Sequence, residues 1–153
     1  MLNYVELNLN PKKRKTGDCS TRAISAVLGI DYADALRLQY EESSKCFYDP
    51  TSKQVVARVL AKFGYAKVQQ PKKSNGKKYL VKEIDQITTK AEREKGILVT
   101  VANHHTCVYN NSIIDIWNCG NKTIGNYYVR CQDIKPKDIK YSTEVINKLI
   151  NIK

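Results

Sequence analysis

Apolar residues recur every three or four positions through the first half of the chain, a spacing that places them on one face of a helix. This pattern predicts a helix over residues 21–28, and Gly29 follows where a left-handed C-terminal cap is expected. It predicts two more helices over residues 32–42 and 51–63, and Gly64 ends the second of these. The N-terminal half is therefore expected to be helical.

Beyond Gly96 the pattern changes to short runs rich in β-branched and aromatic residues, which are typical of strands. Asn110-Asn111 separates two of these runs, and asparagine tolerates the positive φ that a hairpin turn requires. The expected fold class is α+β, with N-terminal helices packed on a C-terminal antiparallel sheet. The predicted strands are residues 97–102, 106–109, 113–117 and 127–131.

Three further segments complete the expected organisation. Residues 70–78 combine Pro, Ser, Asn and Gly with lysines, and this composition predicts an exposed loop. Residues 81–95 are charged and compatible with a helix, and residues 142–152 are expected to form the last helix. Because 153 residues is the usual size of one domain, residues 1–153 are expected to form a single domain.

The chain carries a net charge of +11, with basic runs at residues 12–15, 72–73 and 77–78. Such a charge attracts nucleic acid or another acidic partner. The lysines are spread along the chain rather than gathered on one predicted helix, and the tyrosines lack the pattern of an RNA-binding sheet. An ordinary solvated surface is therefore the favoured interpretation.

No run of apolar residues approaches the length of a membrane span. The charges near the N-terminus follow the first apolar residues, which is the reverse of a signal peptide. These features predict a cytoplasmic protein without a membrane partner.

Five cysteines, an odd number without a C-x-x-C pair, argue against a disulfide framework. Cys107, Cys119 and Cys131 recur every 12 residues, but structural zinc sites draw their ligands in closely spaced pairs. We therefore expect mostly reduced thiols, with no metal and no other cofactor.

Cys19 falls at the first turn of the first predicted helix, after a tight turn at Gly17-Asp18. At such a position the unpaired backbone N–H groups and the helix dipole stabilise a thiolate, and the same N–H groups can bind a developing oxyanion. Cys19 is therefore a candidate nucleophile. The alternative is a small buried cysteine that packs the helix start.

The only two histidines, His104 and His105, stand together at the start of a predicted strand. A nucleophilic thiol needs a base of this kind and a second group, usually Asn or Asp, that fixes its tautomer. With the asparagine turn as predicted, Asp115 lies across from about residue 106, within reach of either histidine. Alternation along the strand does not decide between the two, and a histidine pair without catalytic use is the alternative.

Trp117 is the only tryptophan and follows Asp115 by two residues, so it is predicted to share the same face of the strand. An indole there would shield a His–Asp hydrogen bond from water. A lone strand tryptophan is also common as simple core.

The order Cys, His, Asp, with the cysteine on an early helix and the others on a later sheet, is that of the papain-like cysteine peptidases. The motifs Thr16-Gly17-Asp18-Cys19 and Asp115-Ile116-Trp117 are similar to those of a family of small phage-encoded papain-fold proteins. This resemblance implies a triad of Cys19, one histidine and Asp115, and the family's His-to-Asp spacing fits His104 better than His105.

The chain departs from the papain pattern at one position. Papain-like enzymes usually have a Gln six residues before the cysteine, where it completes the oxyanion hole, and this chain has Lys13 there. Lys13 or a backbone N–H in the turn at residues 15–17 is the expected substitute. Asp18 and Trp117 are expected to support the site.

The expected function is that of a cysteine peptidase or related amide or isopeptide hydrolase that acts on a peptide or protein through a thioester, in the cytoplasm of an infected bacterial host. One alternative is a binding protein on a papain-like scaffold, which holds nucleic acid or an acidic host factor through its basic surface. The other is an acyltransferase of the same fold.

Overall fold

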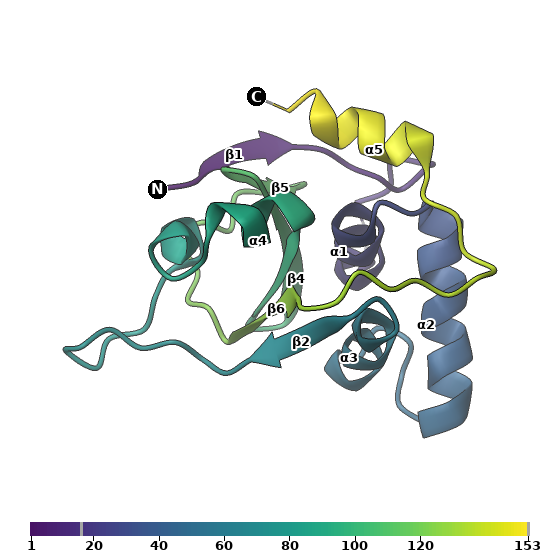
Figure 1. The fold of residues 1–153 in the computed structure, drawn as a ribbon, viewed down its shortest axis with the longest axis horizontal. Helices are drawn as coiled ribbons and strands as arrows, with labels where there is room; N and C mark the ends of the chain where they lie inside the picture. The colour runs from purple at the N-terminus through teal and green to yellow at the C-terminus, as the bar shows by residue number, and fades with distance from the viewer. Residues whose placement is uncertain (16, 153) are drawn as a thin grey trace.

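The computed structural model describes residues 1–15 and 17–152. Its centre is a six-stranded mixed sheet. The strand order is β1-β5-β4-β3-β6-β2 (Figure 1). β1 pairs in parallel with β5, and the other neighbouring pairs are antiparallel. The strands are β1 (Asn3–Glu6), β2 (Tyr65–Val68), β3 (Ile97–Val101), β4 (His104–Tyr109), β5 (Ser112–Asp115) and β6 (Asn126–Arg130).

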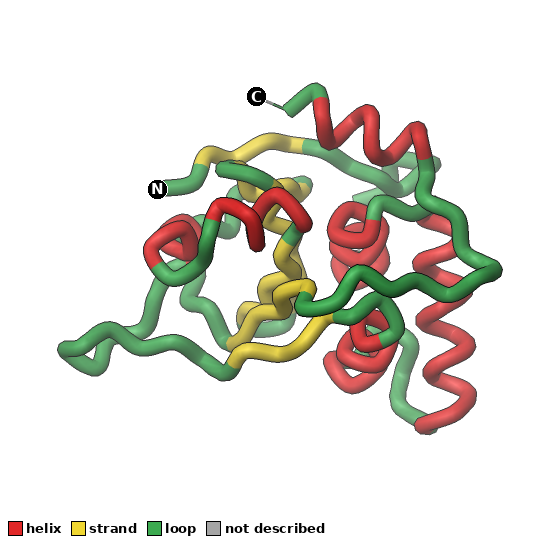
Figure 2. The backbone as a smooth tube through the Cα atoms, viewed as in Figure 1, coloured by secondary structure: helices red, strands yellow, loops and turns green. Residues whose placement is uncertain are grey.

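Helices flank this sheet on both sides (Figures 1 and 2). α1 packs against β4, with α2 and α3 on the same side, and α4 packs on the other side against β4 and β6. None of the helices in the described part is long and apolar enough to cross a membrane. The helices are α1 (Cys19–Leu28), α2 (Tyr32–Cys46), α3 (Lys53–Ala61), the 3-10 helix η1 (Val81–Gln86), α4 (Lys90–Lys95) and α5 (Thr143–Ile150).

Alternation along the central strands sends apolar side chains into a core on each face of the sheet. On the α1 side, Leu98 and Cys107 join a cluster with the buried residues of α1, α2, α3 and α5. On the other side, Val99 and Val108 join a cluster that includes the buried residues of η1. The central strands are therefore buried on both faces, which fixes their register.

The helix signals in the sequence are confirmed, with shifts at the ends. Gly29 caps α1 in the left-handed conformation, with φ of 63°. α2 runs on to Cys46, beyond its expected end at residue 42. α3 begins later than expected because the Ser52 side chain accepts the Val55 N–H and so makes Ser52 the N-cap.

The prediction of a purely antiparallel sheet built from the C-terminal half is wrong. Two strands from the N-terminal half join the sheet, and one of them pairs in parallel. β1 and β2 form the two edges of the sheet, and each has only four residues. Short edge strands that are partly exposed leave little hydrophobic alternation in the sequence, so the pattern did not reveal them. The four predicted strands are confirmed with shifted ends, and residues 81–95 form η1 and α4.

Gly64→Ala is expected to destabilise the protein more than Gly76→Ala. Both glycines have a left-handed backbone, with φ of 82° and 83°, so the strain of about 1–2 kcal/mol that an L residue incurs there is shared. A Cβ at Gly64 would lie 2.0 Å from the Gln132 carbonyl oxygen, whereas a Cβ at Gly76 meets nothing within 4 Å. Urea unfolding should give Gly64→Ala an additional loss of at least about 1–3 kcal/mol. Equal losses in the two variants would contradict this packing.

Candidate active site

The β4–β5 hairpin brings His104 and Asp115 together. The asparagine turn forms as predicted, and Cys107 pairs with Ile114 across the hairpin. Continuing that register sets Asp115 opposite residue 106, so His104 lies two residues further along on the same face of the sheet. Nε2 of His104 lies 2.6 Å from Oδ2 of Asp115, within hydrogen-bonding distance.

The Asp115 carboxylate is buried, and both of its oxygens have partners. Oδ1 accepts the Ile116 N–H at 2.7 Å and lies 3.8 Å from Nη2 of Arg22. Oδ2 contacts His104 and also lies 3.8 Å from Sγ of Cys119, whose thiol points toward it as a weak donor. These contacts hold the carboxylate in one orientation toward the imidazole ring.

Cys19 is the first residue of α1 and is partly buried. Burial by itself would raise the pKa of its thiol. Hydrogen bonds to the His104 side chain and the His105 backbone, with the charges of His104 and Arg22, instead hold this pKa below its usual value. The N-terminus of α1 also favours the thiolate. The sequence-predicted nucleophile therefore lies against the sequence-predicted base.

The pKa of the His104 ring is shifted upward, opposite to that of the Cys19 thiol. Burial by itself would lower the pKa of His104, but hydrogen bonds to Asp115, Cys119 and Cys19 hold it well above its usual value. Because Nε2 contacts Asp115, Nδ1 is the ring nitrogen left for the thiol. A lowered thiol pKa beside a raised imidazole pKa is the pattern that favours proton transfer from the thiol to the ring.

His105 points to the opposite face of β4 and has a different environment. Its Nδ1 lies 3.2 Å from the Thr100 hydroxyl, within the sheet. Burial and the neighbouring charge of His104 lower the pKa of His105 to about 4, so its ring is neutral at pH 7. Its backbone N–H hydrogen-bonds to the Cys19 thiol. The geometry therefore brings His104 rather than His105 to Asp115.

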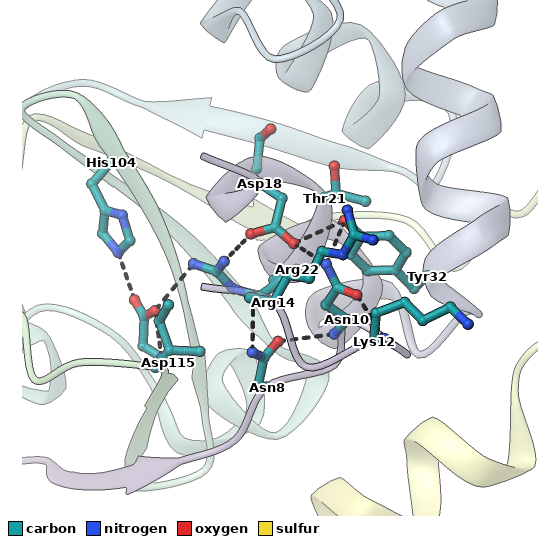
Figure 3. A network of polar contacts seen from close by, with 12 residues as sticks. Asn8, Asn10, Lys12, Arg14, Asp18, Thr21, Arg22, Tyr32, His104 and Asp115 are labelled. Atoms are coloured by element: carbon teal, nitrogen blue, oxygen red, sulfur yellow. Dashed lines mark hydrogen bonds and ion pairs between the residues drawn. The ribbon is translucent and has the colours of Figure 1, made fainter. Parts of the chain in front are cut away.

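Arg22 links the start of α1 to the end of β5. Its guanidinium forms a close ion pair with Asp18, one turn earlier, and reaches toward Asp115 on its other side (Figure 3). Asp18 also accepts hydrogen bonds from Asn10 Nδ2 at 2.9 Å and from the Tyr32 hydroxyl at 2.8 Å. Burial by itself would raise the pKa of Asp18, yet these partners hold it below its usual value.

Arg22 and Asn10 are residues of the site that the sequence analysis did not assign. The four-residue spacing of Asp18 and Arg22 on one helix is a signal that predicts their ion pair. Asn10 reaches Asp18 only because the loop between β1 and α1 folds back, with Asn8 Oδ1 accepting the Asn10 N–H at 3.0 Å. No spacing rule in the sequence anticipates that path. Asp18 belongs to this network, and its side chain makes no cap hydrogen bond.

Lys13 does not complete the oxyanion hole. Its ammonium group donates to the Asn8 carbonyl oxygen at 3.0 Å, and the residue lines a surface hollow beside Tyr32 rather than the one beside Cys19. This local contact turns the side chain away from the thiol, so the expectation for Lys13 is corrected. The alternative donor, a backbone N–H in the turn at residues 15–17, involves residue 16, which lies outside the described residues.

Trp117 stacks against the His104 ring, although not for the expected reason. β5 ends at Asp115, so Trp117 lies in the bend that follows and strand alternation does not place it. The two ring centroids are 4.8 Å apart, with the planes tilted by 48°. The indole is 39% exposed, which excludes a simple core role and makes it a cover over His104.

Cys119 adds a third possible metal ligand to His104 and Asp115, because their ligand atoms lie within 4.8 Å of one another. A cation there would have to separate the two atoms of the 2.6 Å His104–Asp115 contact and would lie close to the Arg22 guanidinium. The arrangement therefore fits a hydrogen-bonded His–Asp pair better than a metal centre.

A hollow of about 550 Å³ opens beside Cys19 and both histidines. A second hollow, of about 410 Å³ and lined by α1, α5 and Arg130, includes none of the candidate catalytic residues. We therefore take the hollow beside Cys19, called the thiol hollow below, as the candidate substrate site. It is lined by Gly17, Cys19, Thr51, Lys53, Thr100, Val101, Asn103, His104, His105 and Asn126.

Comparisons with protein-family models, with curated proteins and with solved structures find no match to this chain.

Arg22→Met is expected to destabilise the protein by about 3–5 kcal/mol, because it leaves the buried carboxylates of Asp18 and Asp115 without their cation. Arg37→Met is the matched control. Arg37 also contacts several carboxylates, but its side chain is 39% exposed, so its removal should cost less than about 1 kcal/mol. Urea unfolding measures both. Similar losses in the two variants would contradict the account of Arg22 as a buried bridge.

Proposed function

We propose that this protein is a papain-like cysteine peptidase or a related amide or isopeptide hydrolase, with Cys19 as nucleophile, His104 as base and Asp115 as the residue that orients the base. The observation that carries this proposal is the 2.6 Å contact of His104 Nε2 with Asp115, together with the lowered pKa of the Cys19 thiol beside the same ring. A base held by a carboxylate and facing the same hollow as a thiol of lowered pKa is the arrangement that nucleophilic acyl transfer requires.

In the proposed reaction, the Cys19 thiolate attacks the acyl carbon of an amide, a C–S bond forms, and the carbonyl electron pair moves onto oxygen. Backbone N–H at the start of α1 stabilises this oxyanion. As the carbonyl re-forms, the C–N bond breaks and the His104 imidazolium gives its proton to the departing amine. The product of this half-reaction is a thioester on Cys19.

In the second half-reaction, neutral His104 takes a proton from a water molecule as the water oxygen attacks the thioester carbon. The C–S bond then breaks, which releases the carboxylic product and restores the thiolate–imidazolium pair. Asp115 keeps Nδ1 directed at the thiol through both steps, and Trp117 limits the access of water to the His104–Asp115 contact.

The helix-to-sheet arrangement also supports the papain-like fold as a proposal. The cysteine begins a helix that packs on the sheet, and the histidine and aspartate lie on adjacent antiparallel strands of that sheet. The intact site favours a hydrolase over the alternative of a binding scaffold, because a surface that only held nucleic acid would have no physical use for a buried His–Asp pair beside a lowered-pKa thiol.

Iodoacetamide labelling of Cys19 across a pH series tests the proposal. With its pKa lowered, the thiol should stay reactive well below pH 8.5 and lose reactivity only as the pH falls through that lowered pKa. In His104→Ala the hydrogen bond and charge are lost while burial remains, so the thiol pKa rises. The rate at pH 7 then falls by about tenfold for each unit by which the thiol pKa rises above 7. Peptide mass spectrometry measures the rate at Cys19 specifically.

His105→Ala is the matched control, because it removes the neighbouring ring but keeps the backbone N–H that faces Cys19. It should label nearly as fast as the wild type, and Asp115→Asn should label more slowly because the imidazolium is less stabilised. Slow labelling of the wild type, unchanged in every variant, would remove the basis for an enzyme and favour a binding protein.

A further inference from the structure

The thiol hollow is lined by several polar side chains and carries positive charge. Among its described lining residues none is acidic, and Val101 is the only aliphatic residue larger than glycine. Threonine, asparagine and histidine make up most of the other lining residues, and Lys53 adds a cation. A lysine without an acidic neighbour in the described lining favours a negatively charged group.

Lys53 differs from the other basic residues around it in lacking an acidic partner. Lys45, Arg58 and Lys62 all contact the buried carboxylate of Glu42. Lys53, at the start of α3, is exposed and forms no ion pair with any residue in the described part of the chain. Its charge is therefore free to pair with a group that enters the hollow.

Asn126 offers a second contact in the hollow. Its Oδ1 atom is buried and has no hydrogen-bond partner within residues 1–15 and 17–152. Asn126 pairs across the sheet with Thr100, whose hydroxyl lies 3.2 Å from His105 Nδ1. An unsatisfied buried acceptor is unfavourable, so a rotation of the Asn126 side chain that turns Oδ1 into the hollow would let an N–H donor there satisfy it.

We propose that the substrate of this site is a peptide with an acidic residue next to the scissile amide on its acyl side. The carboxylate of that residue pairs with Lys53, and a peptide N–H donates to Asn126. The net charge of +11 acts in the same direction at longer range, since it draws acidic chains toward the protein. This inference rests on the proposed function, because it assigns a substrate class to the same nucleophile.

The test uses three peptidyl acyloxymethyl ketones, which alkylate a catalytic thiolate and carry N-acetyl-Glu-Glu, N-acetyl-Gln-Gln or N-acetyl-Lys-Lys before the ketone. The rate of modification of Cys19 is followed by mass spectrometry in the full-length wild type. The Glu-Glu probe should react about fivefold faster than the Lys-Lys probe, with the Gln-Gln probe between them. The ratio of two probes on one protein cancels differences in thiol reactivity.

Lys53→Glu should reduce this ratio by about fivefold or more, to near or below one. The variant should fold, because Lys53 is exposed and a carboxylate in the first turn of α3 suits the helix dipole. Lys77→Glu is the matched control. It makes the same change in net charge on the exposed loop at residues 70–78, far from α3 in Figure 1, and should leave the ratio near its wild-type value.

Each outcome decides between the two claims. If all three probes modify Cys19 at equal rates, or if Lys77→Glu lowers the ratio as much as Lys53→Glu, the acidic specificity is wrong while the reactive thiol stands. If no probe modifies Cys19 in the wild type, the proposed function fails and this inference fails with it.

Discussion

The arrangement of the site depends on one buried guanidinium. Arg22 lies between Asp18, the residue just before α1, and Asp115, at the end of β5, and its side chain is only 8% exposed. Cys19 follows Asp18 directly in the chain, and His104 contacts Asp115. The ion pairs of Arg22 with these two carboxylates therefore join the helix that carries the thiol to the strands that carry the imidazole. Buried charges are unfavourable unless fully partnered, and Asn10 and Tyr32 complete the partners of Asp18.

Two adjacent histidines have opposite properties because successive residues of a strand face opposite sides of a sheet. His104 turns to Asp115 and Cys19, which raise its pKa, whereas His105 turns to Thr100 on the neighbouring strand, where burial and the charge of His104 lower its pKa. Environments that push the pKa values of neighbouring groups apart are typical of sites of acid–base chemistry. The backbone of His105 still contributes, because it contacts the Cys19 thiol.

The central elements could be predicted from the sequence, because residues buried against the sheet carry strong periodicity. The three long helices, the four central and C-terminal strands and the asparagine turn all follow from such patterns. The hairpin register followed from the turn, and it correctly set Asp115 opposite residue 106. The edge strands β1 and β2 could not be predicted, because partly exposed four-residue strands carry little periodicity. Lys13 was misassigned and Asn10 was missed because both depend on how an irregular loop folds back, which residue spacing does not encode.

The central claim is that His104 and Cys19 form a thiolate–imidazolium pair, and the protonation state of the two histidines tests it most directly. Long-range ¹H–¹⁵N spectra of protein labelled with ¹⁵N-histidine distinguish a doubly protonated ring from a neutral one. The chain has only two histidines, so His104→Ala and His105→Ala assign both signals. The account predicts one charged ring at pH 7, belonging to His104, and one neutral ring, belonging to His105. Two neutral rings at pH 7 would contradict it.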